Sequence, residues 1–160
     1  MEIASHEAGY TILGKDPEKW NPLTKETADH SLPYIVGMAL REGKIDNSSY
    51  SEKKFRDSKI LDFLKRITVV EDKTLSSMYP EAVANRVTVK LSSGKIVSKQ
   101  VDYHKGHPKN PMSDQDVEEK FLRLTRKILD KNHARRILDA AWNLEKAKDL
   151  SKMVAMMTLR

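Results

Sequence analysis

The sequence predicts an α+β fold, with a small antiparallel sheet and flanking helices followed by a helical C-terminal segment. Two patterns lead to this prediction. In the middle of the chain, residues 86–91 and 96–103 alternate between apolar and polar side chains on either side of Ser93-Gly94, which is typical of a β-hairpin. In the last third, apolar residues recur every three or four positions, which places them on one face of an α-helix.

Length and composition limit the class of protein. A chain of 160 residues suits one domain, or a domain with a small appendage. Its longest apolar runs are far shorter than the roughly 20 residues of a membrane span. The absence of Cys excludes disulfides, a thiolate zinc site and an iron–sulfur cluster held by this chain. We expect no membrane contact, no secretory signal and a cytoplasmic location.

The charge distribution suggests anionic partners. The net charge is +6, and the second half of the chain carries the excess of Lys and Arg, a feature that also occurs in nucleic-acid-binding proteins. Aromatic residues, which would stack on bases, make up only 6%. We therefore favour a solvated surface that attracts small anions, and we expect no nucleic-acid partner.

The first elements are short. Residues 2–13 alternate loosely and predict a strand or extended segment. Gly and Pro residues and an Asn-Pro step predict a loop over residues 14–22. A helix should follow, because Ser31 precedes Pro33 in a first helical turn and Gly43 is a typical stop.

The helix could also start earlier, at Thr24, with Pro33 as a kink. A second, shorter helix is predicted to begin at Asp57 or Ser58. The β-branched run over residues 67–70 then predicts a short strand. Each strand of the hairpin that follows has one apolar face, formed by Val87, Val89 and Leu91 and by Val97, Val101 and Tyr103.

The C-terminal third predicts three helices after a loop over residues 104–112. Ser113 is placed to cap the first helix, and Asp116 completes a capping box. The apolar stripe of this helix consists of Val117, Phe121, Leu124 and Ile128.

The second of these helices carries Ile137, Ala141 and Leu144 on one face, and the last is predicted to begin at Asp149. The apolar side of the last helix is rich in methionine. Such residues usually belong to a core, and otherwise they mark a surface that packs on another chain or domain. They are Leu150, Met153, Val154 and Met157.

The first candidate site is the segment Asp29-His30-Ser31, with Tyr34 one helical turn later. A His beside an acid can be held in one tautomer and can act as a general acid or base. Free N–H groups at a helix start favour a carboxylate ligand. The alternative, which spacing alone favours, is that Asp29 or Ser31 only caps the helix while His30 packs against the sheet.

The second candidate is the loop over residues 104–109, which contains Lys105, Gly106 and His107. A glycine-containing loop with two Lys and two His could bind an anion or cover a site. The alternative is a simple polar connection between strand and helix. No set of His, Asp and Glu has the spacing of metal ligands, so we expect no metal.

Four stretches resemble the C-terminal part of the MmgE/PrpD family of 2-methylcitrate dehydratases and cis-aconitate decarboxylases. They are Thr24–Gly43, Arg66–Asp72, Ala84–Gly94 and Gly106–Phe121, in the order in which the family has them. The combination of ETADHSLPY and GHPKNPMSD is the most specific part of the resemblance.

The resemblance implies a domain organisation. Residues 1–111 would form an α+β domain similar to the family's lid, and residues 112–160 would be a helical segment that packs on an N-terminal helical domain. That helical domain, in the same enzyme or as a separate subunit, is the expected partner, and the resemblance also implies a homo-oligomer. The absent partner would explain the methionine-rich last helix.

The resemblance further implies lyase chemistry on a tricarboxylate, in propionate metabolism, with no metal and no cofactor. Most of the family's acid/base groups lie in the N-terminal helical region, to which no part of this sequence corresponds, so we expect the isolated chain to be inactive. A non-catalytic binding or interaction module derived from the family is the alternative. The expected catalytic residues are His30 and Asp29, and the expected substrate-binding residues are Ser31, Tyr34, Lys105 and His107.

Overall fold

The computed structural model describes residues 1–158. The chain divides into two compact units, Met1–His104 and Lys105–Arg160. Their boundary falls inside the loop predicted over residues 104–112, before Pro111. Among the described residues, no helix is long and apolar enough to cross a membrane.

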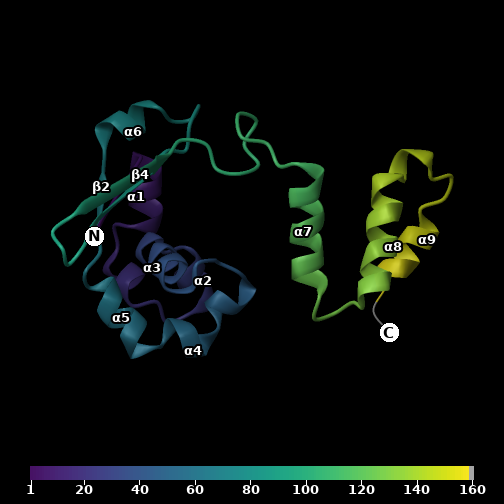
Figure 1. Ribbon diagram of the computed structural model, residues 1–160, viewed down its shortest axis with the longest axis horizontal. Coiled ribbons are helices and arrows are strands. Elements are labelled where there is room, and N and C mark those ends of the chain that lie inside the picture. Colours follow the sequence, from purple (N-terminus) through teal and green to yellow (C-terminus); the bar gives the residue numbers. More distant parts are fainter. Residues whose placement is uncertain (159–160) are drawn as a thin grey trace. The chain divides into compact units, whose positions relative to one another are not determined.

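The first unit is built on a four-stranded sheet with the strand order β2-β1-β3-β4 (Figure 1). Together with the surrounding helices, it confirms the α+β class. The pairings β1–β3 and β3–β4 are antiparallel, but β1–β2 is parallel, so the sheet is mixed and the purely antiparallel prediction was wrong. The long helical connection between β1 and β2 allows the parallel pairing. The strands are β1 (Glu2–Ser5), β2 (Thr68–Glu71), β3 (Asn85–Lys90) and β4 (Ile96–Val101).

The prediction of one extended segment over residues 2–13 was wrong in its second half. Strand β1 ends at Ser5, and helix α1 (Glu7–Leu13) follows directly. His6 caps this helix, because its Nδ1 atom accepts a hydrogen bond from the Gly9 backbone N–H at 3.3 Å. Histidine is an uncommon N-cap, so the local sequence does not show the change from strand to helix.

The helix predicted after Ser31 is confirmed as α3 (Leu32–Glu42). The Ser31 hydroxyl accepts a hydrogen bond from the Tyr34 N–H at 3.1 Å, and Gly43 ends the helix with a left-handed φ of +72°. One kinked helix from Thr24 does not form, since Thr24 caps a separate helix, α2 (Lys25–Asp29).

The remaining helical elements of the first unit are short. The predicted helix after Asp57 is confirmed as α5, whereas η1, η2, α4 and α6 were not predicted. They are η1 (Pro17–Trp20), η2 (Asn47–Tyr50), α4 (Glu52–Phe55), α5 (Ser58–Leu64) and α6 (Lys73–Ser77).

The core of this unit lies between one face of the sheet and the helices α3 and α5. Each fully buried large aliphatic or aromatic side chain contributes about 1.5–3 kcal/mol relative to an exposed one. Ala4, Leu75 and Ala84 form a smaller cluster. The main cluster includes Ile3, Val69, Tyr34, Met38, Ile60 and Leu64.

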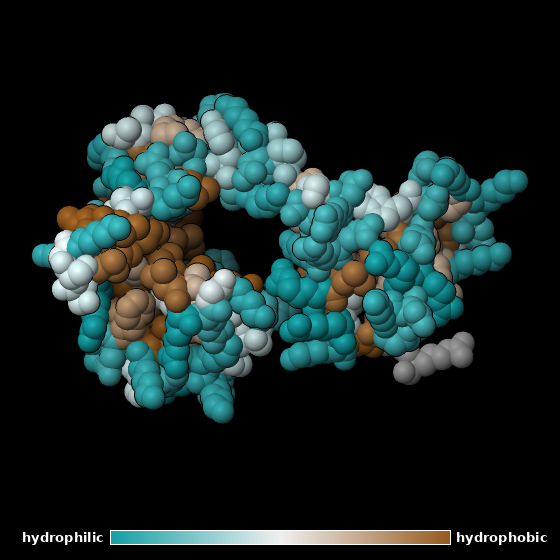
Figure 2. Space-filling model, in the orientation of Figure 1, coloured by the Kyte–Doolittle hydropathy of each residue, from teal (hydrophilic) through white to brown (hydrophobic). Residues whose placement is uncertain are grey.

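The predicted hairpin is confirmed, with Val89 opposite Val97 and Gly94 in the turn at a φ of +84°. Its apolar faces are not buried, however. Every residue of β4 is exposed, and Val97 and Val101 each expose 47% of their surface. Figure 2 shows apolar residues gathered on the face of this unit where the hairpin lies.

The second unit consists of α7 (Asp114–Thr125), α8 (Lys131–Trp142), η3 (Leu144–Lys146) and α9 (Ser151–Met157). The predicted capping box at the start of α7 is confirmed. The last helix begins two residues later than expected. Leu144 lies beyond α8, in η3.

The apolar stripes of this unit are only partly covered. Only α8 contributes buried residues, and α7 and α9 have none among the described residues. The exposed apolar side chains are Val117, Leu124, Ile128, Trp142, Leu144, Leu150, Val154 and Met157.

Candidate functional site

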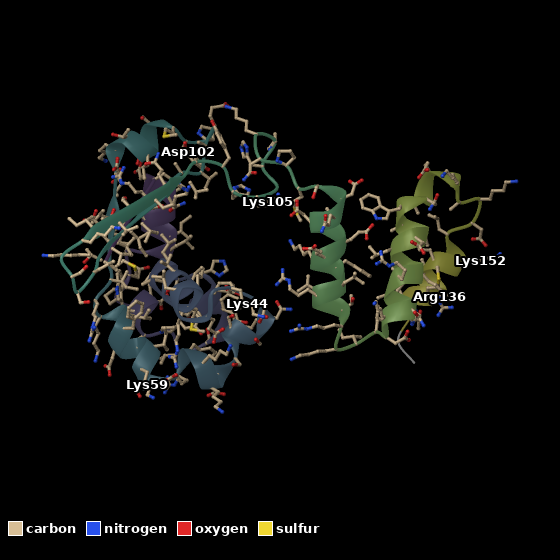
Figure 3. All side chains as sticks on the ribbon, viewed as in Figure 1. Lys44, Lys59, Asp102, Lys105, Arg136 and Lys152 are labelled. Carbon is tan, nitrogen blue, oxygen red and sulfur yellow. The ribbon has the colours of Figure 1, made fainter. Side chains whose placement is uncertain are left out.

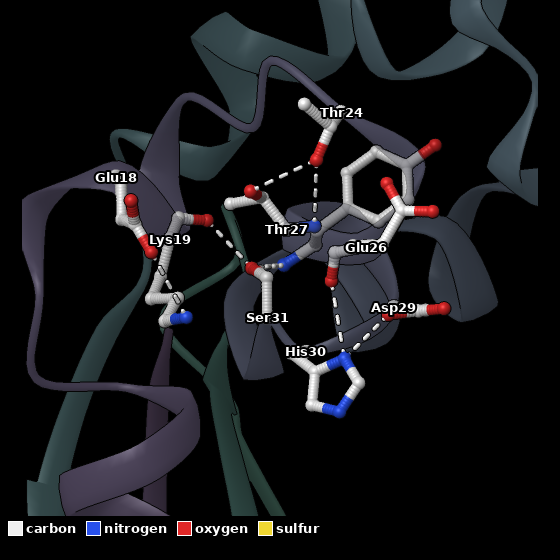
Figure 4. A network of polar contacts seen from close by, with 9 residues as sticks. Glu18, Lys19, Thr24, Glu26, Thr27, Asp29, His30 and Ser31 are labelled. Carbon is white, nitrogen blue, oxygen red and sulfur yellow. Dashed lines mark hydrogen bonds and ion pairs between the residues drawn. The ribbon is translucent and has the colours of Figure 1, made fainter.

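His30 lies at the junction between α2 and α3 (Figure 4). Thr24 starts α2 as its N-cap, and the helix ends at Asp29. Ser31 is the N-cap of α3, so His30 and Ser31 are the two residues that lie between the helices. Each of the two helices is therefore capped at its start by a side chain, and the backbone N–H of His30 ends α2 by donating to the Glu26 carbonyl.

His30 and Asp29 form a hydrogen-bonded pair at the surface. The Nδ1 atom of His30 lies 2.5 Å from Oδ1 of Asp29 and 3.1 Å from the carbonyl oxygen of Glu26. Because a carboxylate and a carbonyl both accept, Nδ1 carries the proton. The His30 side chain is 64% exposed, which excludes the alternative that it packs against the sheet.

The surroundings of His30 favour its protonated form. The hydrogen bond to the Asp29 carboxylate, and then that to the Glu26 carbonyl, raise the pKa of His30 above its usual value, while the charge of Lys19 acts in the opposite direction. Nε2 forms no hydrogen bond within residues 1–158. A His held by an acid through Nδ1 can exchange a proton with a ligand through Nε2.

Ser31 and Tyr34, which follow His30 in the sequence, are fully buried. The Ser31 hydroxyl donates to the Lys19 carbonyl at 2.5 Å, and the Tyr34 hydroxyl donates to the Ser49 carbonyl at 2.5 Å. Burial also raises the pKa of Tyr34 to about 12. Both hydroxyls thus donate hydrogen bonds to backbone carbonyls inside the first unit.

Lys19 belongs to the same network, although the sequence contains no signal for it. Its surface is only 8% exposed, and its Nζ atom lies 3.2 Å from Oε1 of Glu18. The neighbouring Trp20 indole donates to the Ile67 carbonyl at 2.9 Å. The loop predicted over residues 14–22 thus contains a buried lysine.

Lys105 belongs to the second unit and lies in the connection that precedes α7 (Figure 3). Its Nζ atom forms an ion pair with Asp116 at 2.8 Å. Hydrogen bonds from Lys105 and Ser113 hold the pKa of Asp116 well below its usual range. Lys105 therefore tethers the loop to the capping box of α7.

Lys105 also lines a shallow pocket of about 590 Å³ together with residues of α7. The pocket contains more cations than acids, which suits an anion. Only Lys105 among these residues was predicted as a site residue. The charged lining residues are Lys105, Lys120, Arg123, Arg126, Asp116 and Glu119.

His107 does not line this pocket. Its Nδ1 atom accepts a hydrogen bond from the Lys109 N–H at 3.1 Å. The Gly106 N–H donates to the Asn110 carbonyl at 2.8 Å, with Gly106 at a φ of +97°. His107 thus helps to close a tight turn.

A metal site is not evident in the part of the chain that the structure describes. No group of three or more His, Cys, Asp and Glu residues among residues 1–158 could hold a metal ion. The His30–Asp29 pair remains the arrangement with the clearest acid/base geometry.

Comparisons with known proteins agree with the resemblance noted in the sequence. A family model described as "MmgE/PrpD C-terminal domain" matches residues 1–146. A 2-methylcitrate dehydratase from Cupriavidus necator is 31% identical over 67% of this chain and 22% of its own length. One from Salmonella typhi is 29% identical over 88% of this chain and 30% of its own length.

A human cis-aconitate decarboxylase is 24% identical over 85% of this chain and 28% of its own length. The chain thus spans less than a third of the length of these relatives. Because the family model covers almost the whole chain, this protein belongs to the MmgE/PrpD family and carries its C-terminal domain.

Proposed function

We propose that this chain is the C-terminal part of a 2-methylcitrate dehydratase-like lyase that acts on a tricarboxylate. The observation that carries the proposal is the His30–Asp29 pair, with Nδ1 held at 2.5 Å from the carboxylate. Family membership supports the reaction class, since relatives are named 2-methylcitrate dehydratase and cis-aconitate decarboxylase.

In the proposed dehydration, a base takes a proton from the carbon next to a substrate carboxylate, and the hydroxyl on the neighbouring carbon leaves as water. His30 in its protonated form donates the proton to that hydroxyl through Nε2. Asp29 orients the ring and stabilises the imidazolium. The pKa of His30 is therefore raised, which favours the protonated form that a general acid needs. The base belongs to another part of the enzyme.

The partner in this proposal is the helical remainder of the enzyme, in the same protein or in a separate subunit. The exposed apolar residues Leu150, Val154 and Met157 of α9 offer a surface for it. We further propose a cytoplasmic homo-oligomer that needs no metal and no cofactor. On this view, the 160-residue chain by itself has no dehydratase activity.

Reconstitution tests the proposal. The chain is co-expressed with the N-terminal part of the Cupriavidus necator relative, and dehydration of 2-methylcitrate and citrate and decarboxylation of cis-aconitate are assayed with and without a chelator. We expect activity only in the complex, unaffected by the chelator. His30→Ala should lower kcat by about 10²–10⁴-fold while the complex stays assembled.

Lys25→Ala is the matched control, because Lys25 is an exposed residue of the neighbouring helix α2 and should leave kcat unchanged. Full activity of His30→Ala would refute the catalytic role of His30. A complex that forms but turns over none of the three substrates would favour the non-catalytic module instead.

A further inference from the structure

Lys19 is the one Lys, Arg, Asp or Glu residue that is buried among residues 1–158. Lysine is almost never buried without a partner, because its ammonium group is costly to remove from water. A lysine in this position therefore calls for an explanation beyond its methylene packing.

The turn that carries Lys19 is fixed at two points. The Lys19 carbonyl accepts the 2.5 Å hydrogen bond from Ser31, the residue next to His30. On the other side, the Trp20 indole donates to the Ile67 carbonyl at 2.9 Å. The backbone of Lys19 is thus tied directly to the junction that holds His30.

The ammonium group of Lys19 forms an ion pair with the carboxylate of Glu18, an exposed side chain. Glu18, whose side chain is 60% exposed, places Oε1 at 3.2 Å from Nζ. An ammonium group has three N–H donors, and Glu18 is the one partner of Nζ within the described residues. An incoming carboxylate could replace Glu18 without exposing any of the core, because Glu18 can turn into solvent.

Through the hydrogen bond from Ser31 to the Lys19 carbonyl, Lys19 is held beside the residue that follows His30, and its charge opposes the protonation of His30. Figure 4 shows the Lys19 side chain, which belongs to η1, and the His30 side chain on the two sides of Ser31. Asp29 pairs with His30, and Glu18 pairs with Lys19. A second carboxylate between the two cations would be held by both.

We propose that Lys19 is the carboxylate-binding residue of the His30 site, where its ammonium group holds a substrate carboxylate in place of Glu18. This inference rests on the proposed function, since it assigns a ligand contact beside the acid His30. Glu18 acts as an internal competitor that occupies Lys19 when no ligand is bound.

The test uses the 160-residue chain and citrate as the probe. Citrate is titrated at pH 7 while the imidazole resonances of His30 and the backbone amides of residues 17–31 are followed by NMR. We expect these signals to shift with saturation in the parent chain. Lys19→Met, which keeps the length of the buried chain, should weaken citrate binding at least about tenfold, because it removes a charge-assisted contact.

Two further variants sharpen the result. Glu18→Gln should strengthen citrate binding several-fold, because it removes the competing carboxylate while leaving Lys19 in place, and its outcome does not depend on the folding of Lys19→Met. Lys25→Met removes an exposed positive charge from the nearby helix α2 and should change citrate binding by less than about twofold, as expected for a screened surface charge.

The outcomes separate the two proposals. Unchanged affinity in both Lys19→Met and Glu18→Gln, with binding abolished by His30→Ala, would overturn the role of Lys19 alone. An equal loss of citrate affinity in Lys19→Met and Lys25→Met would also overturn the role of Lys19, because it would indicate a general attraction of citrate to positive charge. If citrate shifts neither His30 nor residues 17–31 in the parent chain, the carboxylate site beside His30 is refuted altogether.

Discussion

His30 is subject to two opposing charges, and the negative one dominates. The Asp29 carboxylate accepts a hydrogen bond from Nδ1 directly, whereas Lys19 acts through its charge from the neighbouring turn η1. The net effect is a raised pKa, which favours the protonated imidazole, while the side chain is 64% exposed. A side chain of this kind can serve as an acid only if its partner carboxylate stays in place.

Asp29→Asn should therefore lower the pKa of His30 towards the ordinary value of about 6.5, because the charged hydrogen-bond acceptor is lost. The measurement is an NMR titration of the His30 ring protons. Glu26→Gln is the control, since Glu26 contacts His30 through its backbone carbonyl and should leave this pKa unchanged. An unshifted pKa in Asp29→Asn would show that the pair does not form.

His6 behaves in the opposite way. It is 6% exposed, its ring stacks on Tyr79 with centroids 4.9 Å apart, and burial lowers its pKa. The unfolded chain therefore takes up this proton at a higher pH than the folded chain does. It follows that the free energy of unfolding should fall as the pH drops below about 6.5.

His6→Asn should remove this pH dependence, because Asn can accept the same cap hydrogen bond from Gly9 without titrating. Urea unfolding at pH 5 and pH 7.5 is the measurement. His30 has a raised pKa, so its contribution to the free energy of unfolding is lost as the pH rises. To remove this opposing effect, chains with and without His6→Asn are compared when both also carry His30→Asn. The same pH slope in both chains would contradict the assignment to His6.

At the scale of elements, the Ser31 hydroxyl connects α3 with η1. Its hydroxyl caps α3 through the Tyr34 N–H and at the same time holds η1 through the Lys19 carbonyl. The hydroxyl is fully buried, so water cannot replace either contact. This double role explains why η1 keeps a defined position beside the start of α3.

Ser31→Ala should lower the free energy of unfolding by about 2 kcal/mol or more, because it removes the N-cap of α3 and leaves the Lys19 carbonyl without its hydrogen bond. Thr24→Ala removes the exposed cap of α2 and should cost about 1 kcal/mol or less. Denaturant unfolding compares the two variants. A loss in Ser31→Ala no larger than that in Thr24→Ala would argue against the double role.

At the scale of the whole molecule, the second unit covers little of its own apolar surface. Leu150, Val154 and Met157 expose 53%, 62% and 48% of their surface on α9. The apolar stripe of α7 is similarly uncovered, with Leu124 at 42%. A surface of this kind on an isolated chain tends to bind hydrophobic dyes or another protein surface.

We expect the chain to self-associate or to bind such a dye, and the double variant Leu150→Lys with Val154→Lys to reduce both effects. Light scattering and dye fluorescence are the measurements. Ile12→Lys, at an exposed apolar site of the first unit, is the control and should change neither. A monomeric parent chain without dye binding would refute the expectation.

Signals between neighbouring residues were sufficient for several elements. Ser31, Pro33 and Gly43 predicted α3 correctly, and Ser113 with Asp116 predicted the start of α7. The alternating runs likewise predicted the β3–β4 hairpin. Helix ends and tight turns depend on hydrogen bonds between residues a few positions apart, so the sequence by itself determined them. It also placed Asp29 and His30 side by side and indicated the family.

Tertiary structure decided what depends on distant residues. It brought β1 beside β2 in parallel, buried the Tyr34 hydroxyl against Ser49 and left β4 exposed. It also buried Lys19 next to the His30 junction, a position that no local pattern marks. Burial and long-range hydrogen bonds are set by whichever segment packs opposite a residue, and in this fold that segment is often far away in the sequence.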